Sequence, residues 1–184
     1  IIATNTPTDL PISMYSKIFS SLSADYISNN NETLKAVDQI SNYFGNIGTY
    51  IMDRGYDDKK YFKEFNNRGL KYIIRGKKNR TVLYKENKIN IVDLAKQFKG
   101  KYNITLNIKG KTINRYCSYA KINISDVKQE LYAVFVYFKN EVAIFYTNRE
   151  LNVKNDVLNV IKNYYMRWRI EEYFKYKKQT FDFE

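Results

Sequence analysis

Apolar and polar positions along the chain follow two periods, one typical of helices and one typical of strands. Residues 31–44 carry apolar side chains at intervals of three and four and end before Gly45, which predicts a helix. Residues 49–52 and 70–75 are short apolar runs, which predict two buried strands. Between them, residues 58–67 predict a second helix, with Asp57 as its cap.

The pattern changes between residues 79 and 147. Residues 102–109 alternate between apolar and polar side chains, which predicts a half-buried strand. Residues 131–138 and 142–147 are nearly continuous apolar runs separated by three polar residues, which predicts a hairpin of buried strands. From residue 152 to about residue 179 the spacing predicts one long helix. The order of elements is therefore α/β, interrupted by a β-rich segment.

Composition narrows the chemistry that such a domain can perform. The chain has 184 residues, no histidine and one cysteine, Cys117. These counts exclude an internal disulfide, catalysis that needs a histidine base, and zinc sites that need histidine. The formal net charge of +12 favours a polyanion such as DNA as partner. The longest purely apolar run has eight residues, too short to cross a bilayer, so we expect no membrane association.

Four polar residues in the C-terminal helical pattern share one narrow stripe. At about 100° per residue they fall within an arc of about 60° on a continuous helix. They are Tyr164, Arg167, Glu171 and Lys178. A carboxylate flanked by a phenol, a guanidinium and an ammonium group is suited to bind a metal ion and phosphate.

A second carboxylate, Asp53, directly follows the buried strand of residues 49–52. The carboxyl end of a strand in an open α/β sheet is a common place for catalytic residues. Gly55 allows the backbone to turn sharply there. The alternative is that Asp53 only caps a turn, which is a frequent role of aspartate.

These motifs, in this order, resemble the catalytic region of a bacterial insertion-sequence transposase of the DDE type. More narrowly, the chain resembles the group with the signature Y-(x2)-R-(x3)-E-(x6)-K. Residues 53–56, Asp-Arg-Gly-Tyr, match the second aspartate motif of that family, and residues 71–80 resemble the strand and basic loop that follow it. The stripe supplies all four fixed positions of the signature: Tyr164, Arg167, Glu171 and Lys178.

The resemblance implies a ribonuclease H-like mixed sheet with flanking helices, interrupted by a β-rich insertion. Residues 1–78 and 148–184 would form the catalytic core and residues 79–147 the insertion. Two Mg²⁺ or Mn²⁺ ions would be held by Asp53, Glu171 and a further aspartate. The DNA contacts would come from residues of the signature and of the basic segments: Tyr164, Arg167, Lys178, Arg54, Lys77, Lys78 and Arg80.

The resemblance also implies partners and a location. The domain would bind double-stranded DNA at transposon ends and targets, work as a homodimer, and reside in the bacterial cytoplasm at the nucleoid. The family's first aspartate lies on the first strand of the fold. Asp9 and Asp25 are the early candidates, but both fall in segments that read as loops. We therefore expect the first strand to lie upstream of this sequence.

Each candidate has a plainer interpretation. Glu171 could pair within its helix with Arg167 or Lys175, Tyr164 could be a core residue, and the basic loop after residue 75 could be a solvated turn. At the level of function, a DNA-binding module derived from a transposase and another ribonuclease H-like nuclease are the alternatives. A basic domain that does not bind nucleic acid ranks last.

Overall fold

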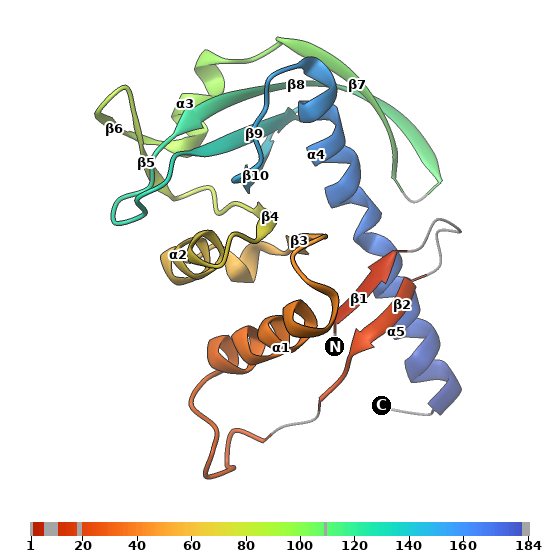
Figure 1. Ribbon diagram of the computed structural model, residues 1–184. Helices are drawn as coiled ribbons and strands as arrows, with labels where there is room; N and C mark the ends of the chain where they lie inside the picture. The colour runs from red at the N-terminus through yellow and green to blue at the C-terminus, as the bar shows by residue number, and fades with distance from the viewer. Residues whose placement is uncertain (1, 6–10, 18–19, 109, 182–184) are drawn as a thin grey trace. The chain divides into compact units, whose positions relative to one another are not determined.

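The computed structural model describes residues 2–5, 11–17, 20–108 and 110–181. The chain forms two compact units (Figure 1). One unit consists of residues 48–166, and the other of residues 1–47 and 167–184.

The larger unit contains a six-stranded mixed sheet in the order β3-β4-β10-β9-β8-β7. Only the β3–β4 pair is parallel, and the other neighbours are antiparallel. A separate two-stranded ribbon is formed by β5 and β6. The elements are β3 (Thr49–Met52), the 3-10 turn η1 (Arg54–Tyr56), α2 (Lys59–Asn67), β4 (Lys71–Arg75), β5 (Thr81–Tyr84), β6 (Asn87–Asn90), α3 (Ile91–Gln97), β7 (Tyr102–Ile108), β8 (Lys111–Ile122), β9 (Leu131–Tyr137), β10 (Val142–Thr147) and α4 (Lys154–Met166).

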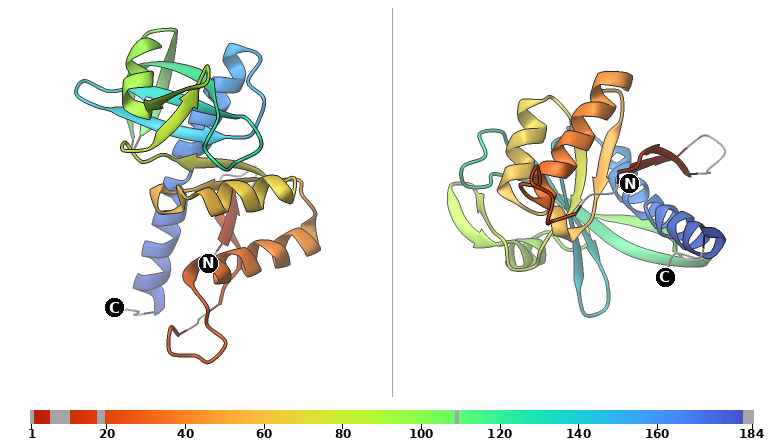
Figure 2. Two further views of the ribbon diagram at one scale, coloured as in Figure 1. Left: turned by 90° about the vertical axis from the view of Figure 1, so that its left-hand side faces the viewer. Right: turned by 90° about the horizontal axis from the view of Figure 1, so that it is seen from below.

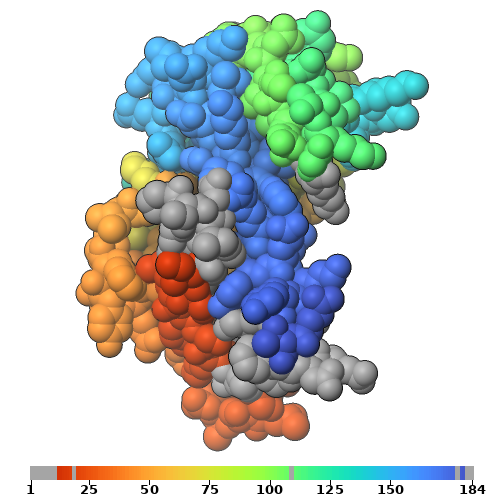
Figure 3. All heavy atoms as spheres, turned by 90° about the vertical axis from the view of Figure 1, so that its right-hand side faces the viewer, coloured from red at the N-terminus to blue at the C-terminus, as the bar shows by residue number. Residues whose placement is uncertain are grey.

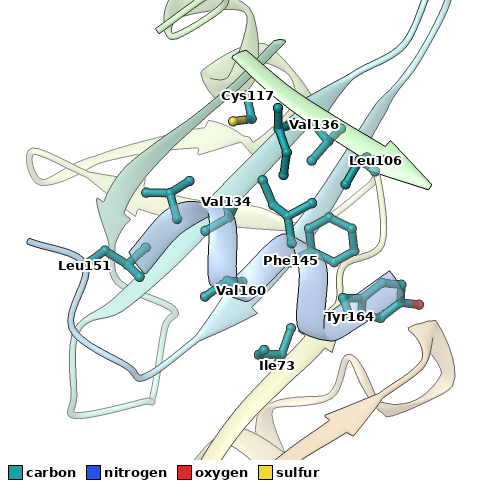
Figure 4. Close-up of a cluster of buried hydrophobic side chains, with 13 residues drawn as sticks. Ile73, Leu106, Cys117, Val134, Val136, Phe145, Leu151, Val160 and Tyr164 are labelled. Atoms are coloured by element: carbon teal, nitrogen blue, oxygen red, sulfur yellow. The ribbon is translucent and has the colours of Figure 1, made fainter. Parts of the chain in front are cut away.

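Helix α4 covers one face of this sheet and supplies its main apolar core (Figure 4). Its buried side chains recur at intervals of three or four, as one apolar stripe of a helix requires. They pack on alternate residues of the strands beneath. Helix α4 contacts β7, the strand at the end of the sheet that is paired with β8 (Figure 3). The buried cluster consists of Ile73, Ile104, Leu106, Cys117, Val134, Val136, Ala143, Phe145, Leu151, Val157, Val160, Ile161 and Tyr164.

The opposite face of the sheet is covered by α2 and α3 (Figure 2). The ring of Phe62 on α2 packs edge-on against Tyr146 of β10, with centroids 5.7 Å apart. The hydroxyl of Tyr137 on β9 donates to the Ala95 carbonyl of α3 at 2.7 Å. Both faces are therefore buried, which explains the nearly continuous apolar runs of β9 and β10.

The smaller unit contains β1 (Ile2–Asn5), β2 (Pro11–Tyr15), α1 (Asn29–Phe44) and α5 (Trp168–Phe181). Strands β1 and β2 form an antiparallel hairpin. Helix α1 begins at Ser28, whose side chain accepts from the Asn31 N–H, and ends at Gly45, which has a positive φ of 68°. Glu32 in its first turn is held by Lys17 and Lys35, and their hydrogen bonds lower its pKa.

The predicted mixed α/β class is confirmed, and so are the strands of residues 49–52 and 70–75 and the hairpin of residues 131–147. Two local predictions were wrong. Asp58, not Asp57, caps α2. The predicted single C-terminal helix is two helices, with Arg167 in a turn between them. Within the segment predicted to be β-rich, the helix α3 lies between β6 and β7.

In the part of the chain that the structure describes, no helix combines the length and the apolar character needed to cross a membrane.

Cys117 gives a test of the core under α4. Its side chain is fully buried, and burial raises the pKa of its thiol to about 11. The thiol is therefore protonated and shielded at pH 8, where only the thiolate is nucleophilic. We expect an aromatic disulfide reagent to label the folded protein at pH 8 at least about a hundred times more slowly than the protein unfolded in guanidinium. Labelling at similar rates in the two states would contradict the core packing described above.

Candidate active site

Asp53 lies at the carboxyl end of β3, where the chain leaves the sheet for η1. Its side chain is exposed, and its Oδ1 accepts from the N–H of Gly55 at 2.8 Å. This local bond orients the carboxylate from the backbone two residues ahead. A Cβ atom on residue 55 would lie 3.1 Å from the same Oδ1, so only glycine leaves the carboxylate undisturbed.

Asp57 ends the same turn and is buried beneath it. Its Oδ1 forms an ion pair with Nη2 of Arg80 at 2.5 Å, and its Oδ2 accepts from the Lys77 N–H at 2.6 Å. The same Nη2 donates to the Asp57 carbonyl at 2.8 Å. The guanidinium also lies 5.4 Å from the ring centroid of Phe62. This arrangement joins the segment after β3 to the segment after β4 and favours a structural role for Arg80.

Arg75 ends β4 beside Asp53. Met52 pairs with Ile74 in the parallel ladder, so Asp53 and Arg75 are the next residues on the two strands. The Arg75 guanidinium lies 5.5 Å from the ring centroid of Phe145 and 5.8 Å from that of Tyr164. It thus connects the edge that carries Asp53 with the last full turn of α4.

Tyr164 is buried, and its ring centroid lies 4.5 Å from that of Phe145. Figure 4 shows its hydroxyl pointing away from the labelled apolar side chains. The ring is therefore part of the core, as the plainer interpretation held, while the predicted contact of the hydroxyl with DNA stays a prediction. Burial raises the pKa of the neighbouring Tyr165 to about 12, so its hydroxyl is protonated at neutral pH.

Helix α4 gives way to α5 at Arg167, where the Ile170 N–H donates to the Arg167 carbonyl three residues back. One turn further, Arg167 Nη2 contacts Glu171 Oε1 at 2.7 Å. This is the intrahelical pair that the sequence offered as the alternative for Glu171. The Glu171 side chain is 56% exposed, so the carboxylate is open to solvent on α5. The four residues of the signature therefore lie on two helices and the turn between them.

The remaining predicted site residues fall in three places. Arg54 and Lys77 are exposed near the ends of β3 and β4. Lys78 pairs with Glu141 at 2.8 Å, and this hydrogen bond, with smaller effects of Arg75 and Arg54, lowers the pKa of Glu141. Lys178 is part of α5, but its side chain lies outside the described residues.

The two early candidates for the first aspartate were Asp9 and Asp25. Asp9 lies outside the described residues. Asp25 is exposed in a turn that precedes α1. Within the described ranges, no three carboxylate or thiol side chains are grouped closely enough to hold a metal ion.

The fold and these residues define a class of protein, an α/β domain with a basic loop and an exposed carboxylate at the carboxyl end of a parallel strand pair. A family model for the transposase DDE domain matches residues 19–184. The chain therefore belongs to the transposase DDE domain family, which implies a role in DNA cleavage and strand transfer during transposition. No curated protein sequence matches the chain.

Family membership confirms the resemblance to DDE transposases, whereas the narrower group with the Y-(x2)-R-(x3)-E-(x6)-K signature stays a prediction. Sequence analysis missed two residues of the site. Arg75 could have been noticed as a charge at the end of a buried strand that runs parallel to β3. Asp57 was assigned to a helix cap because an aspartate before a helix usually has that role.

The buried ion pair of Asp57 gives a stability prediction. We expect Asp57→Ala to lower the free energy of unfolding by about 3–5 kcal/mol, because it leaves the Arg80 charge buried without its partner. Glu141→Ala removes an exposed ion pair and is the matched control, with an expected loss of at most about 1 kcal/mol. Chemical denaturation followed by circular dichroism measures both. Equal losses would show that the Asp57–Arg80 pair is not the anchor described.

The glycine beside Asp53 gives a prediction on activity. Gly55→Ala places a methyl group against the Asp53 carboxylate, so we expect roughly tenfold slower DNA cleavage by the full-length protein, since small displacements of reacting groups are costly. Gly48→Ala is the control, because a Cβ there meets no atom within 4 Å. Rates from single-turnover assays and melting temperatures are compared. Undiminished cleavage by Gly55→Ala would argue against a catalytic Asp53.

Proposed function

We propose that this chain is the catalytic domain of an insertion-sequence DDE transposase of the group with the Y-(x2)-R-(x3)-E-(x6)-K signature. It cuts the DNA at transposon ends and joins the freed 3′-hydroxyl to a target phosphodiester. The observation that carries the proposal is the exposed carboxylate of Asp53 at the carboxyl end of β3, in a chain whose family match extends through Glu171.

The ribonuclease H-like fold is part of the proposal. The parallel pair β3–β4 with α2 between them in sequence is a βαβ unit, and such units place the carboxyl ends of both strands at one edge of a sheet. Strands β5 to β10 and helix α3 then correspond to the predicted insertion of residues 79–147, which continues the same sheet through the β4–β10 pair.

The donor set fits divalent metal ions. Asp53 and Glu171 are exposed carboxylates, and carboxylate oxygens are the ligands that Mg²⁺ and Mn²⁺ prefer. With a further aspartate they would hold two ions, which when bound supply an activated oxygen nucleophile and offset charge on the phosphate under attack. The proposal requires the two carboxylates to come within about 4–7 Å of each other in the working complex.

The ion pair of Glu171 does not oppose this role. An exposed i, i+4 pair contributes only about 0.3–0.5 kcal/mol, so exchanging Arg167 for a metal ion costs little. Arg167 is then available to bind a phosphate with two parallel hydrogen bonds. Until the metal ion and DNA arrive, the pair holds the carboxylate in one orientation on α5.

Other residues position the DNA. The Arg75 guanidinium contacts the rings of both Tyr164 and Phe145, which themselves pack together, and this fixes the end of α4 before the signature continues into α5. The Tyr164 hydroxyl donates to a phosphate near the cut, and Lys178 neutralises a neighbouring phosphate as a point charge. Arg54 and the lysines after β4 extend the cationic surface. Two copies of the domain act on paired transposon ends.

The test is DNA cleavage by the full-length protein on duplexes that carry the transposon end, with Mg²⁺ or Mn²⁺. We expect Asp53→Asn and Glu171→Gln each to reduce cleavage by at least about a thousandfold, because each removes a charged metal ligand. DNA binding without metal should change less than about threefold.

Glu172→Gln is the matched control, one residue away on the same exposed helix. Equal cleavage by the wild type and both site variants would refute a carboxylate metal site. Binding without cleavage in every sample, wild type included, would instead indicate a DNA-binding module derived from a transposase.

A further inference from the structure

An open basic pocket of about 500 Å³ lies in the unit of residues 48–166, and neither Asp53 nor Glu171 lines it. It is formed by the start of α2, the β4–β5 loop, strand β6 and the loop after β8. Its volume is in the range of about 300–1,000 Å³ that is usual for ligand sites. The lining residues are Lys59, Lys77, Asn79, Arg80, Thr81, Lys88 and Ser125.

The charges of this pocket are only partly compensated. Lys59 pairs with Asp126 at 2.7 Å, and Arg80 pairs with the buried Asp57. Lys77 and Lys88 are exposed, and neither forms an ion pair with another described residue. The pocket therefore has an excess of two positive charges, which a doubly charged or two singly charged anionic groups would balance.

The pocket is also held in shape before any ligand binds. The Asp57–Arg80 pair fixes its floor, and the Ile91 N–H donates to the Arg80 carbonyl at 2.9 Å. Leu83 and Asn123 exchange two backbone hydrogen bonds of 2.8 and 2.9 Å, which join strand β5 to the loop that carries Ser125. A site whose walls are tied in advance loses little entropy when it binds.

The side chains at the pocket select the kind of group that it binds. Asn79, Thr81 and Ser125 offer an amide and two hydroxyls beside the ammonium groups, which suits phosphate oxygens. Among the described residues no aromatic ring lines the pocket, so they offer no surface on which a base could stack. The chemistry thus favours the sugar-phosphate backbone over the bases.

We propose that this pocket binds backbone phosphates of duplex DNA, independently of sequence, as a second anchor beside the cleavage site. The inference rests on the proposed function in taking DNA as the ligand. Lys77 and Lys88 each neutralise one phosphate, while Arg80 and the two hydroxyls orient the phosphate between them. Arg80 pairs with Asp57, the residue that ends the turn after Asp53. DNA held in the pocket is therefore positioned by the segment that also carries Asp53.

The experiment measures the affinity of the full-length protein for duplex DNA without divalent metal, over a series of salt concentrations. In the variant Lys77→Gln with Lys88→Gln, we expect the slope of log affinity against log salt to become smaller by about 1–2, since each lost phosphate contact removes about 0.9. The change should be the same for transposon-end and random-sequence duplexes.

The matched control replaces two exposed lysines that do not line the pocket, Lys99→Gln with Lys111→Gln. Its slope should stay within about 0.3 of the wild-type slope. Lys77→Arg with Lys88→Arg retains both charges and should also keep the slope. Thermal unfolding must agree among all variants, and the arginine variant distinguishes loss of charge from loss of fold.

The outcomes separate this inference from the proposed function. The proposed phosphate binding in the pocket would be overturned if the salt slope of the Lys77→Gln, Lys88→Gln variant were unchanged, or if the slope of the control variant decreased equally. Neither result would affect cleavage by the wild type. A decrease confined to the transposon-end duplex would also overturn it, because phosphates carry no sequence information. Wild-type protein that binds DNA but never cleaves it would refute the transposase and still leave the slope measurable.

Discussion

The buried ion pair between Asp57 and Arg80 is the constraint on which the rest of this site depends. A buried aspartate is costly unless its charge is matched, and here Arg80 and the Lys77 N–H both satisfy it. The two partners belong to the loops that leave two parallel strands. The pair therefore fixes both loops to one another, although their residues are separated by a helix and a strand. The exposed charges of both loops are positioned by this one internal contact.

The parallel pairing of β3 and β4 determines which side chains those loops present. Successive residues of a strand point to opposite faces, so Ile51 and Ile73 join the core under α4, while Tyr50 packs against α2 through Phe65. One step further along each strand, the apolar sequence stops and Asp53 and Arg75 follow. Strand β4 is largely buried and β3 is half-buried, and their packing holds a short polar edge in place. The polar residues there need to contribute little to stability.

The strands and the position of Asp53 at a strand end could be predicted, because each depends on the pattern of apolar and polar residues that are neighbours in the sequence. The run before Asp53 is apolar and short, and the alternation of β7 separates buried Ile104 and Leu106 from their exposed neighbours. Asp57 could not be assigned from its neighbours, because its partner Arg80 is far along the chain. The turn at Arg167 was missed for a different reason. No proline or glycine lies between α4 and α5, so the sequence contains no signal that would end the helix.

The candidate residues differ in how firmly they are held. Asp57 is buried and Arg80 is partly buried, so their pair would be expensive to rearrange, whereas Glu171 is held by an exposed pair of small strength and Asp53 by a single backbone N–H. This difference is what metal-dependent chemistry requires. Ligands must be oriented in advance but released cheaply when metal ions and DNA replace their partners. A carboxylate locked into a buried pair, like that of Asp57, could not make that exchange, which is why we propose Asp53, rather than its more strongly bound neighbour, as the catalytic aspartate.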